Sequence, residues 1–186
     1  RLCSGEGLWG FGLTEPLAGS DAGGSKTTAV LDGNEWVING SKIFITNAAC
    51  DMTMGVTVQA ITGTKDNGKP EYSCILVEAG TPGFKAVPMH KKLMWRSSNT
   101  AELYFDDVRV PKENILGNKG DGFHQMLATL DGGRLSIGAM GLGGAQGAYD
   151  LALKYAKERQ QFGQPISKFQ AIAFKLADSA MEIECA

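Results

Sequence analysis

The distribution of apolar residues divides the chain into two parts with different periodicities. Up to about residue 110, short runs of β-branched and aromatic residues alternate with turn dipeptides, and four such runs cover 35–38, 41–46, 72–78 and 102–105. Asn39-Gly40 lies between the first two runs and is typical of a tight turn, so the pattern predicts a hairpin there. Short strands with regular turn signals are typical of a β-sandwich or barrel.

After Pro111 the apolar residues recur at helical spacing instead. The series that begins with Phe123, Met126 and Leu130 predicts a helix that continues to about Ala156. Gln164-Pro165 interrupts the pattern, and a second helix is predicted from about Ser167, the candidate N-cap. The change of period puts the boundary between β and α structure near residues 111–120.

Composition and charge exclude several classes of protein. The chain has 186 residues, of which 43% are apolar and 20% charged, so a folded core is expected. The formal net charge is −2 and no basic patch stands out, which argues against a nucleic-acid partner. No apolar run approaches the ~20 residues of a membrane span, and no signal peptide is visible. Four cysteines without a CxxC motif and two histidines predict free thiols and no metal site.

Two glycine-rich patterns have a structural explanation. Residues 5–10 spell GxGxxG, but a dinucleotide site needs a strand before that motif and a helix after it, and neither is predicted. The second pattern, 138–147, lies inside the predicted long helix, where glycines are expected to let another helix approach closely. The chain begins at Arg1 rather than Met and ends within the second predicted helix, so we expect it to be a piece of a longer protein.

Four short segments carry groups that suit either a ligand or ordinary structure. The loop 13–21 offers hydroxyls and bare backbone N–H groups, as an anion site or a simple Pro/Gly turn would. An aromatic and a hydroxyl, Phe44 and Thr46, are two residues apart on one strand, which suits a planar cofactor or a half-buried strand. Asp131 and Arg134 are three residues apart on the long predicted helix, a spacing that suits a ligand site or a surface ion pair. The segment 159–163 fits a helix end with a C′ glycine.

The order and spacing of six segments resemble the acyl-CoA dehydrogenase family over nearly the whole chain. They are Leu-Thr-Glu-Pro-Leu-Ala-Gly-Ser-Asp at 13–21, Asn-Gly-Ser-Lys-Ile-Phe-Ile-Thr-Asn at 39–47, Thr-Pro-Gly-Phe at 81–84, Phe-Asp-Asp-Val-Arg-Val-Pro at 105–111, Thr-Leu-Asp-Gly-Gly-Arg at 129–134 and Arg-Gln-Gln-Phe-Gly-Gln-Pro-Ile at 159–166. The likeness is to the short-chain or butyryl-CoA branch.

The resemblance implies an α+β multidomain fold, with a middle β-barrel or sandwich domain followed by the first helices of a C-terminal four-helix-bundle domain. Residues 1–10 would be the tail of an N-terminal helical domain, 11–115 the middle β domain, and 116–186 the start of the helical domain. The family usually forms a homotetramer and binds FAD.

The resemblance also implies site residues, position by position. The stretch from Phe11 to Ser20 matches residues along the flavin and its diphosphate, and Thr46 would lie near flavin N5. The family often has Trp at the position of Phe44. The implied cofactor-binding residues are Phe11, Leu13, Thr14, Gly19, Ser20, Phe44, Ile45 and Thr46, with Arg159, Phe162 and Gln170 reaching the FAD of a neighbouring subunit. The implied substrate-binding residues are Ser20, Asp131, Gly133 and Arg134.

The implied reaction is α,β-dehydrogenation of an acyl-CoA, with α-proton abstraction by a carboxylate, β-hydride transfer to flavin N5, and electrons passed to an electron-transfer flavoprotein, as in fatty-acid β-oxidation. Some family members carry the catalytic Glu where this chain has Gly133, so the base is expected beyond Ala186 and this piece is expected to be inactive alone. An acyl-CoA oxidase and a non-catalytic acyl-CoA- or flavin-binding paralogue remain alternatives. The expected compartment is the cytoplasm of a bacterium or the mitochondrial matrix of a eukaryote.

Overall fold

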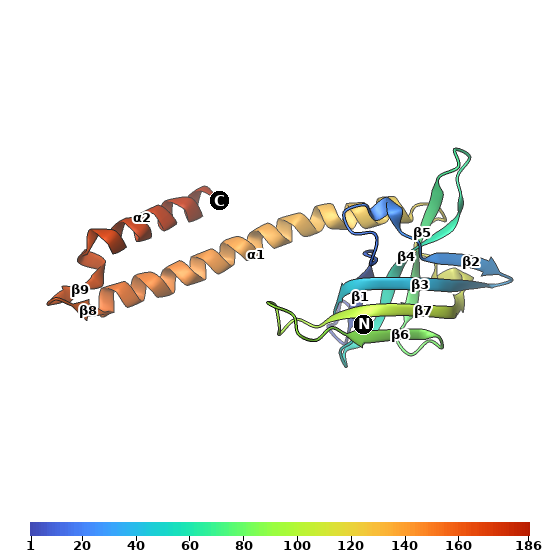
Figure 1. Cartoon of the computed structure of the whole chain (residues 1–186), viewed down its shortest axis with the longest axis horizontal. Helices are drawn as coiled ribbons and strands as arrows, with labels where there is room; N and C mark the ends of the chain where they lie inside the picture. The colour runs from blue at the N-terminus through green and yellow to red at the C-terminus, as the bar shows by residue number, and fades with distance from the viewer. The chain divides into compact units, whose positions relative to one another are not determined.

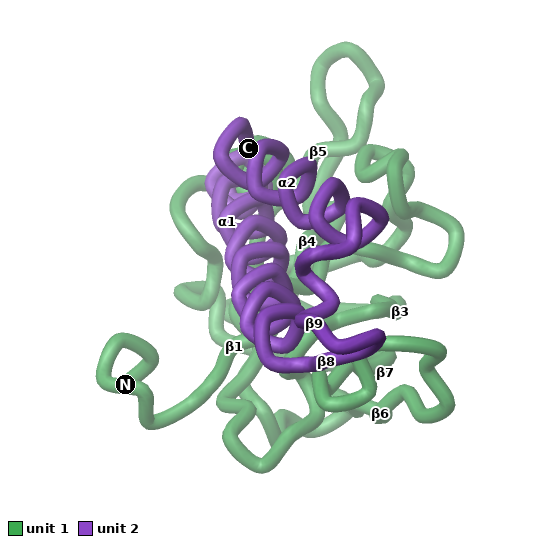
Figure 2. The backbone as a smooth tube through the Cα atoms, turned by 90° about the vertical axis from the view of Figure 1, so that its left-hand side faces the viewer, with its two compact units in different colours: residues 1–128 green, residues 129–186 purple.

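The computed structural model describes residues 1–186, which divide into two compact units, 1–128 and 129–186 (Figure 2). Strands make up most of the first unit, and helices most of the second (Figure 1). Helix α1, Gly122–Glu158, begins in the first unit and continues through the second. The predicted α+β architecture, a β domain followed by helices, is confirmed.

The first unit is built around one mixed seven-stranded sheet. Its strand order is β1-β4-β2-β3-β7-β6, with β5 also paired to β4. Strand β4 runs parallel to β1 and β2, whereas the other pairs are antiparallel. The strands are β1 Leu8–Gly12, β2 Thr28–Asp32, β3 Glu35–Thr46, β4 Thr53–Thr64, β5 Pro70–Glu78, β6 Phe84–Pro88 and β7 Thr100–Pro111. Short 3₁₀ helices lie at Ala22–Gly24 and Lys112–Asn114.

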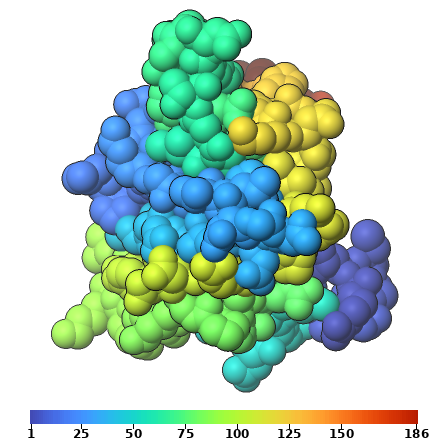
Figure 3. All heavy atoms as spheres, turned by 90° about the vertical axis from the view of Figure 1, so that its right-hand side faces the viewer, coloured from blue at the N-terminus to red at the C-terminus, as the bar shows by residue number.

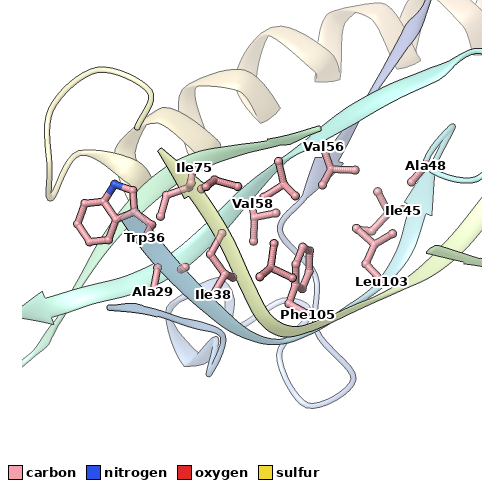
Figure 4. Close-up of a cluster of buried hydrophobic side chains, with 14 of the residues drawn as sticks. Ala29, Trp36, Ile38, Ile45, Ala48, Val56, Val58, Ile75, Leu103 and Phe105 are labelled. Carbon is pink, nitrogen blue, oxygen red and sulfur yellow. The ribbon is translucent and has the colours of Figure 1, made fainter. Parts of the chain in front are cut away.

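Alternation of side chains along the strands fills the core of this sheet. One cluster of buried side chains combines Trp36 and Ile38 of β3, Val56 and Val58 of β4, and Leu103 of β7 (Figure 4). Because successive strand residues face opposite sides, Thr57, between Val56 and Val58, lies outside this cluster and is only half-buried. The core thus holds together the strands that carry the predicted cofactor-binding residues.

The prediction of a turn at Asn39-Gly40 is wrong, because β3 continues through it. The hairpin lies earlier, between β2 and β3, where Asp32 pairs with Glu35. The side chain of Asn39 exchanges two hydrogen bonds of 2.9 Å with Asp107 of β7, whose φ of 47° marks a bulge in that strand. A side chain on Gly40, at φ 142°, would lie 2.6 Å from Thr27 Oγ1. The glycine is needed here for close approach rather than for a turn.

The second unit consists of most of α1, a short hairpin and α2, Gln170–Cys185. The hairpin strands are β8 Gln160–Gln161 and β9 Gln164–Pro165, and a 3₁₀ turn follows at Ile166–Lys168. Ser167 lies within that turn, and Phe169 takes the N-cap position of α2, so the predicted N-cap is wrong.

Helix α1 ends at Glu158, earlier than a C′ cap at Gly163 requires. Phe162 and Gly163, with φ of 52° and 78°, instead form the two-residue loop of the hairpin. Loops of this kind favour positive φ because their twist then matches that of the strands. The glycines of 138–147 do not interrupt α1, but the expected close contact with another helix is not formed within this chain, since a side chain there would meet nothing within 4 Å.

Other structural expectations concern membranes, metals and thiols. None of the helices combines the length and the apolar character needed to cross a membrane. No three His, Cys, Asp or Glu side chains gather as metal ligands. All four cysteines are free thiols, as predicted.

Candidate functional site

The loop after β1 makes a tight turn that exposes its tip. The backbones of Glu15 and Ala18 exchange hydrogen bonds of 3.0 and 3.1 Å. Leu17, between them, is 95% exposed, and Gly19 and Ser20 are exposed too. A Cβ on Gly19 would meet nothing within 4 Å, so the backbone of this segment is open to a ligand.

A bulge in β3 projects the aromatic ring of the second segment outward. Lys42 pairs with Leu103 of β7 and Ile45 with Ala101, so β3 has one extra residue between these two pairs. Phe44 takes up the extra length at φ 63°, and its side chain is 61% exposed. Bulges commonly re-aim a side chain in this way.

The two segments, far apart in the sequence, lie together in the first unit. The N–H of Ile43 donates to the carbonyl of Thr14 at 2.9 Å. Lys42 Nζ donates to the carbonyl of Leu13 at 3.1 Å and to Glu15 Oε1 at 2.9 Å. The loop that carries Thr14 is thereby held against the strand that carries Phe44 and Thr46.

Burial and pairing set the charge states of the Glu15–Lys42 pair. Both side chains are buried, with 7% of Glu15 and none of Lys42 exposed. Burial tends to raise the pKa of Glu15, but hydrogen bonds from Lys42 and from the backbone N–H groups of Lys26 and Thr27 outweigh it, so the pKa is lowered. Burial lowers the pKa of Lys42, and the carboxylate of Glu15 opposes that shift. The geometry is that of a carboxylate paired with an ammonium group.

Neither Glu15 nor Lys42 was among the site residues predicted from the sequence. A signal was present, however, because Trp36, Ile38 and Lys42 fall on alternating positions of one strand face. A lysine at an inward-facing position of a strand requires a buried partner.

The predicted cofactor-binding residues of the first unit differ in what they can offer. The hydroxyls of Thr14, Ser20 and Thr46 make no hydrogen bond within the chain. The side chains of Leu13 and Ile45 are buried in the core, so they can reach a ligand only through their backbone. Phe11 is half-buried against the small cluster of Leu13, Cys74 and Met126.

This set of groups suits a planar heteroaromatic ligand with polar edges. The exposed ring of Phe44 offers a face for stacking. The free hydroxyls of Thr14 and Thr46 offer donors, and the open backbone around Gly19 suits a phosphate. Isoalloxazine and the diphosphate of FAD have these properties.

The remaining predicted residues belong to the second unit. Asp131, Gly133 and Arg134 are exposed on α1, and Arg134 donates to Asp131, as expected for an i,i+3 pair. Arg134 also lines a groove of about 870 Å³ between α1 and α2, together with Gly138 and Glu182. The guanidinium here is therefore accessible to an anionic ligand.

The hairpin and the start of α2 carry the other three residues. Phe162 is 92% exposed at the hairpin loop, and its ring meets that of Phe169 edge-on at 6.1 Å. Arg159 and Gln170 are exposed, and the Arg159 guanidinium has no ion-pair partner in the chain. The predicted residues of the second unit thus lie in two separate groups, because most of the length of α1 separates Asp131, Gly133 and Arg134 from the hairpin and the start of α2.

The first unit also contains a hollow, which the sequence did not predict. It has about 340 Å³ and is lined by Lys65, Lys69, Tyr72 and Phe123, among others. The turn between β4 and β5 supplies the lysines and projects from the unit at the top of Figure 3. A hollow lined by lysine and aromatic side chains suits a nucleotide.

Comparison with known proteins assigns the family. Residues 10–108 match the model of the acyl-CoA dehydrogenase middle domain, and residues 120–186 match that of the acyl-CoA dehydrogenase C-terminal domain. The chain therefore belongs to the acyl-CoA dehydrogenase family, as its motifs predicted.

Three similar proteins illustrate the relationship. A probable acyl-CoA dehydrogenase of Bacillus subtilis is 56% identical over 185 residues, which cover 100% of this chain and 48% of that protein. The structure of butyryl-CoA dehydrogenase from Megasphaera elsdenii is 45% identical with a TM-score of 0.91, covering 99% of this chain and 48% of that one. A glutaryl-CoA dehydrogenase from Mycobacterium smegmatis in complex with FADH2 is 35% identical with a TM-score of 0.88, covering 98% and 45%. The chain spans about half the length of the relatives it matches.

Proposed function

We propose that this chain is part of a longer FAD-dependent enzyme that oxidises short-chain acyl-CoA thioesters to their α,β-unsaturated products. The observation that carries the proposal is the contact between residues 13–15 and 42–43. It holds the loop that carries Thr14 against the strand that carries Phe44 and Thr46, and the ring of Phe44 is exposed. The likeness to butyryl-CoA dehydrogenase supports short straight chains as substrates.

The residues present fit the cofactor that the family implies. Phe44 would stack on the flavin, Thr46 and Thr14 would hydrogen-bond its edges, and the backbone around Gly19 and Ser20 would contact the diphosphate. When bound, FAD supplies the acceptor for a hydride from the substrate β-carbon. Arg159, Phe162 and Gln170 would reach the FAD of a neighbouring subunit, which makes a homotetramer part of the proposal.

The substrate would be held by charged and polar groups away from the reacting carbons. Arg134, with Asp131 and Gly133 beside it, would bind near the CoA arm, and Ser20 would contact both cofactor and substrate. The hollow lined by Lys65, Lys69 and Tyr72 offers further charge for the nucleotide end of CoA. Because these contacts lie away from the α- and β-carbons, they contribute to binding more than to the chemical step.

The α-proton requires a carboxylate base, and a glycine occupies the position where some relatives carry one. A Cβ on Gly133 would meet nothing within 4 Å, so no neighbouring side chain takes that place. We therefore assign the base to a part of the protein outside this chain, and expect residues 1–186 alone to be inactive. Burial of that base with the substrate would raise its pKa towards the working pH.

An assay of electron acceptors tests the proposal in the full-length protein. A dehydrogenase should oxidise butyryl-CoA when an electron-transfer flavoprotein is supplied, with little consumption of O₂. Rapid O₂ consumption would indicate an acyl-CoA oxidase, and binding without turnover would indicate a non-catalytic paralogue. The compartment, cytoplasm in a bacterium or mitochondrial matrix in a eukaryote, is part of the same proposal.

A further inference from the structure

The ammonium group of Lys42 is buried between strand β3 and the loop that follows β1. None of its side chain is exposed, and it donates to the Leu13 carbonyl and to Glu15 Oε1. Removing two charges from water is costly, and apolar side chains of similar volume often give equal or greater stability. The buried pair therefore calls for an explanation other than stability alone.

Every contact of the pair fixes the path of one loop. Lys42 holds the loop at Leu13, and Glu15 accepts N–H groups from Lys26 at 2.6 Å and Thr27 at 3.0 Å. The start of the loop and its return to the sheet are thus both held through the same two side chains. Thr14 lies between the two loop residues that Lys42 contacts.

The other side of the same contact is the bulge in β3. Ile43, next to Lys42, donates to the Thr14 carbonyl, and Phe44 follows with its unusual φ of 63°. A left-handed conformation of an aromatic residue is strained, so the surrounding contacts must maintain it. Lys42 and Ile43 supply those contacts from within the strand.

We propose that the Glu15–Lys42 pair is a positioning device that sets Thr14 and Phe44 relative to each other for flavin binding. This inference rests on the proposed function. Lys42 acts through Leu13 and the strand bulge, and does not touch the flavin itself. Without the pair, the protein would still fold, but the loop and the bulge would no longer be held at a fixed separation.

Three variants of the full-length protein separate positioning from stability. They are Lys42→Met, Glu15→Gln and the double variant, each measured for melting temperature and for the dissociation constant of FAD from the apoprotein. Lys42→Met leaves a buried carboxylate without its cation, so it should lower both stability and affinity. The double variant leaves no unpaired charge and should recover most of the melting temperature. Its FAD dissociation constant should nevertheless stay raised by about tenfold, as expected for loss of a charge-assisted contact.

A surface pair gives the matched control. Lys119 Nζ lies 2.9 Å from Glu71 Oε1, the same separation as in the buried pair, but half of the Lys119 side chain is exposed. Lys119→Met should leave FAD affinity unchanged. If the double variant binds FAD as tightly as the wild type, or if affinity follows melting temperature in all three variants, the pair is only a structural element and the proposal is wrong. A wild-type protein that binds no FAD would instead contradict the proposed function.

Discussion

Glu15 Oε1 and Lys42 Nζ lie 2.9 Å apart with both side chains buried, and this contact joins the first two family motifs. The two residues are 27 positions apart in the sequence. The carboxylate also accepts hydrogen bonds from two backbone N–H groups, and these bonds stabilise its charged form.

Because the pKa of Glu15 is lowered in the fold, the stability of the protein should depend on pH in the acid range. A carboxyl whose folded pKa lies below its ordinary value of 4.5 stabilises the fold above that value, and the contribution is lost as pH falls through the folded pKa. Glu15→Gln should therefore cost about 3–5 kcal/mol near pH 7, and the difference from wild type should shrink below pH 4.5. Thermal melting of the full-length protein between pH 7 and pH 3 measures it. The exposed Glu113→Gln should stay within about 0.5 kcal/mol, and a pH-independent cost for Glu15→Gln would contradict the assignment.

Gly40 is needed because Thr27 packs directly against its backbone. A Cβ would lie 2.6 Å from Thr27 Oγ1 and 2.8 Å from Thr27 Cα, at a φ of 142°. Gly40→Ala should therefore destabilise the protein by about 2–5 kcal/mol, as measured by denaturant unfolding. Gly68→Ala is the control, because Gly68 has a φ of 78° but nothing within 4 Å, and should cost about 1 kcal/mol. Equal costs for the two variants would show that Thr27 does not constrain Gly40.

The Cys74 thiol should be unreactive under native conditions. Burial raises its pKa to about 11 from an ordinary value of 9.0, against the opposing charge of Lys42. At pH 8 its thiolate fraction is about a hundredfold below that of an ordinary thiol. Iodoacetamide followed by mass spectrometry should label the exposed Cys3 well before Cys74, and labelling after denaturation should reach both. Equal native labelling rates would mean that Cys74 is not buried as described.

Thr46 should influence the flavin without supporting the fold. Its hydroxyl makes no hydrogen bond within the chain, so Thr46→Val should change the melting temperature little. Loss of a hydrogen bond to the flavin edge should lower the flavin potential and slow turnover by about tenfold. Thr64→Val, at the exposed end of β4, is the matched control. Unchanged potential and turnover in Thr46→Val would remove Thr46 from the site.

Arg134 should act on substrate binding rather than on stability. Its pairing with Asp131 is exposed, so the pair contributes little to the fold. Arg134→Ala should raise the KM for butyryl-CoA about tenfold with kcat nearly unchanged, because the contact lies away from the reacting carbons. Steady-state kinetics measures this, with Lys154→Ala on the same helix as control. A lower melting temperature at unchanged KM would mean that the ion pair has only a structural role.

Periodicity predicted the elements of this chain, whereas of the turn dipeptides Asp32-Gly33 and Asn39-Gly40 only the first lies at a turn. The apolar spacing from Phe123 onward predicted α1, and the run 72–78 predicted β5, because burial of one face imposes the period. Asn39-Gly40 failed as a turn, since cross-strand bonds to Asp107 and contact with Thr27 outweigh the preference of the dipeptide. Local preference is easily overridden by tertiary contacts.

The site was predicted only through the family motifs. The exposure of Phe44 depends on a bulge set by the register of β7, which the sequence of β3 does not contain. The pairing of Lys42 with Glu15 likewise depends on how the loop returns to the sheet. The sequence could indicate that Lys42 is inward-facing, but only the fold identifies its partner.

Anaerobic titration of the full-length protein with butyryl-CoA tests the central claim most directly. We predict that the visible absorption band of bound flavin bleaches as butyryl-CoA is added, since substrate oxidation reduces the cofactor. Bleaching would require a bound flavin, a working base and acceptance of a short acyl chain together. A flavin band that stays oxidised at saturating butyryl-CoA would contradict the proposed substrate, and the lack of any flavin band would contradict the cofactor.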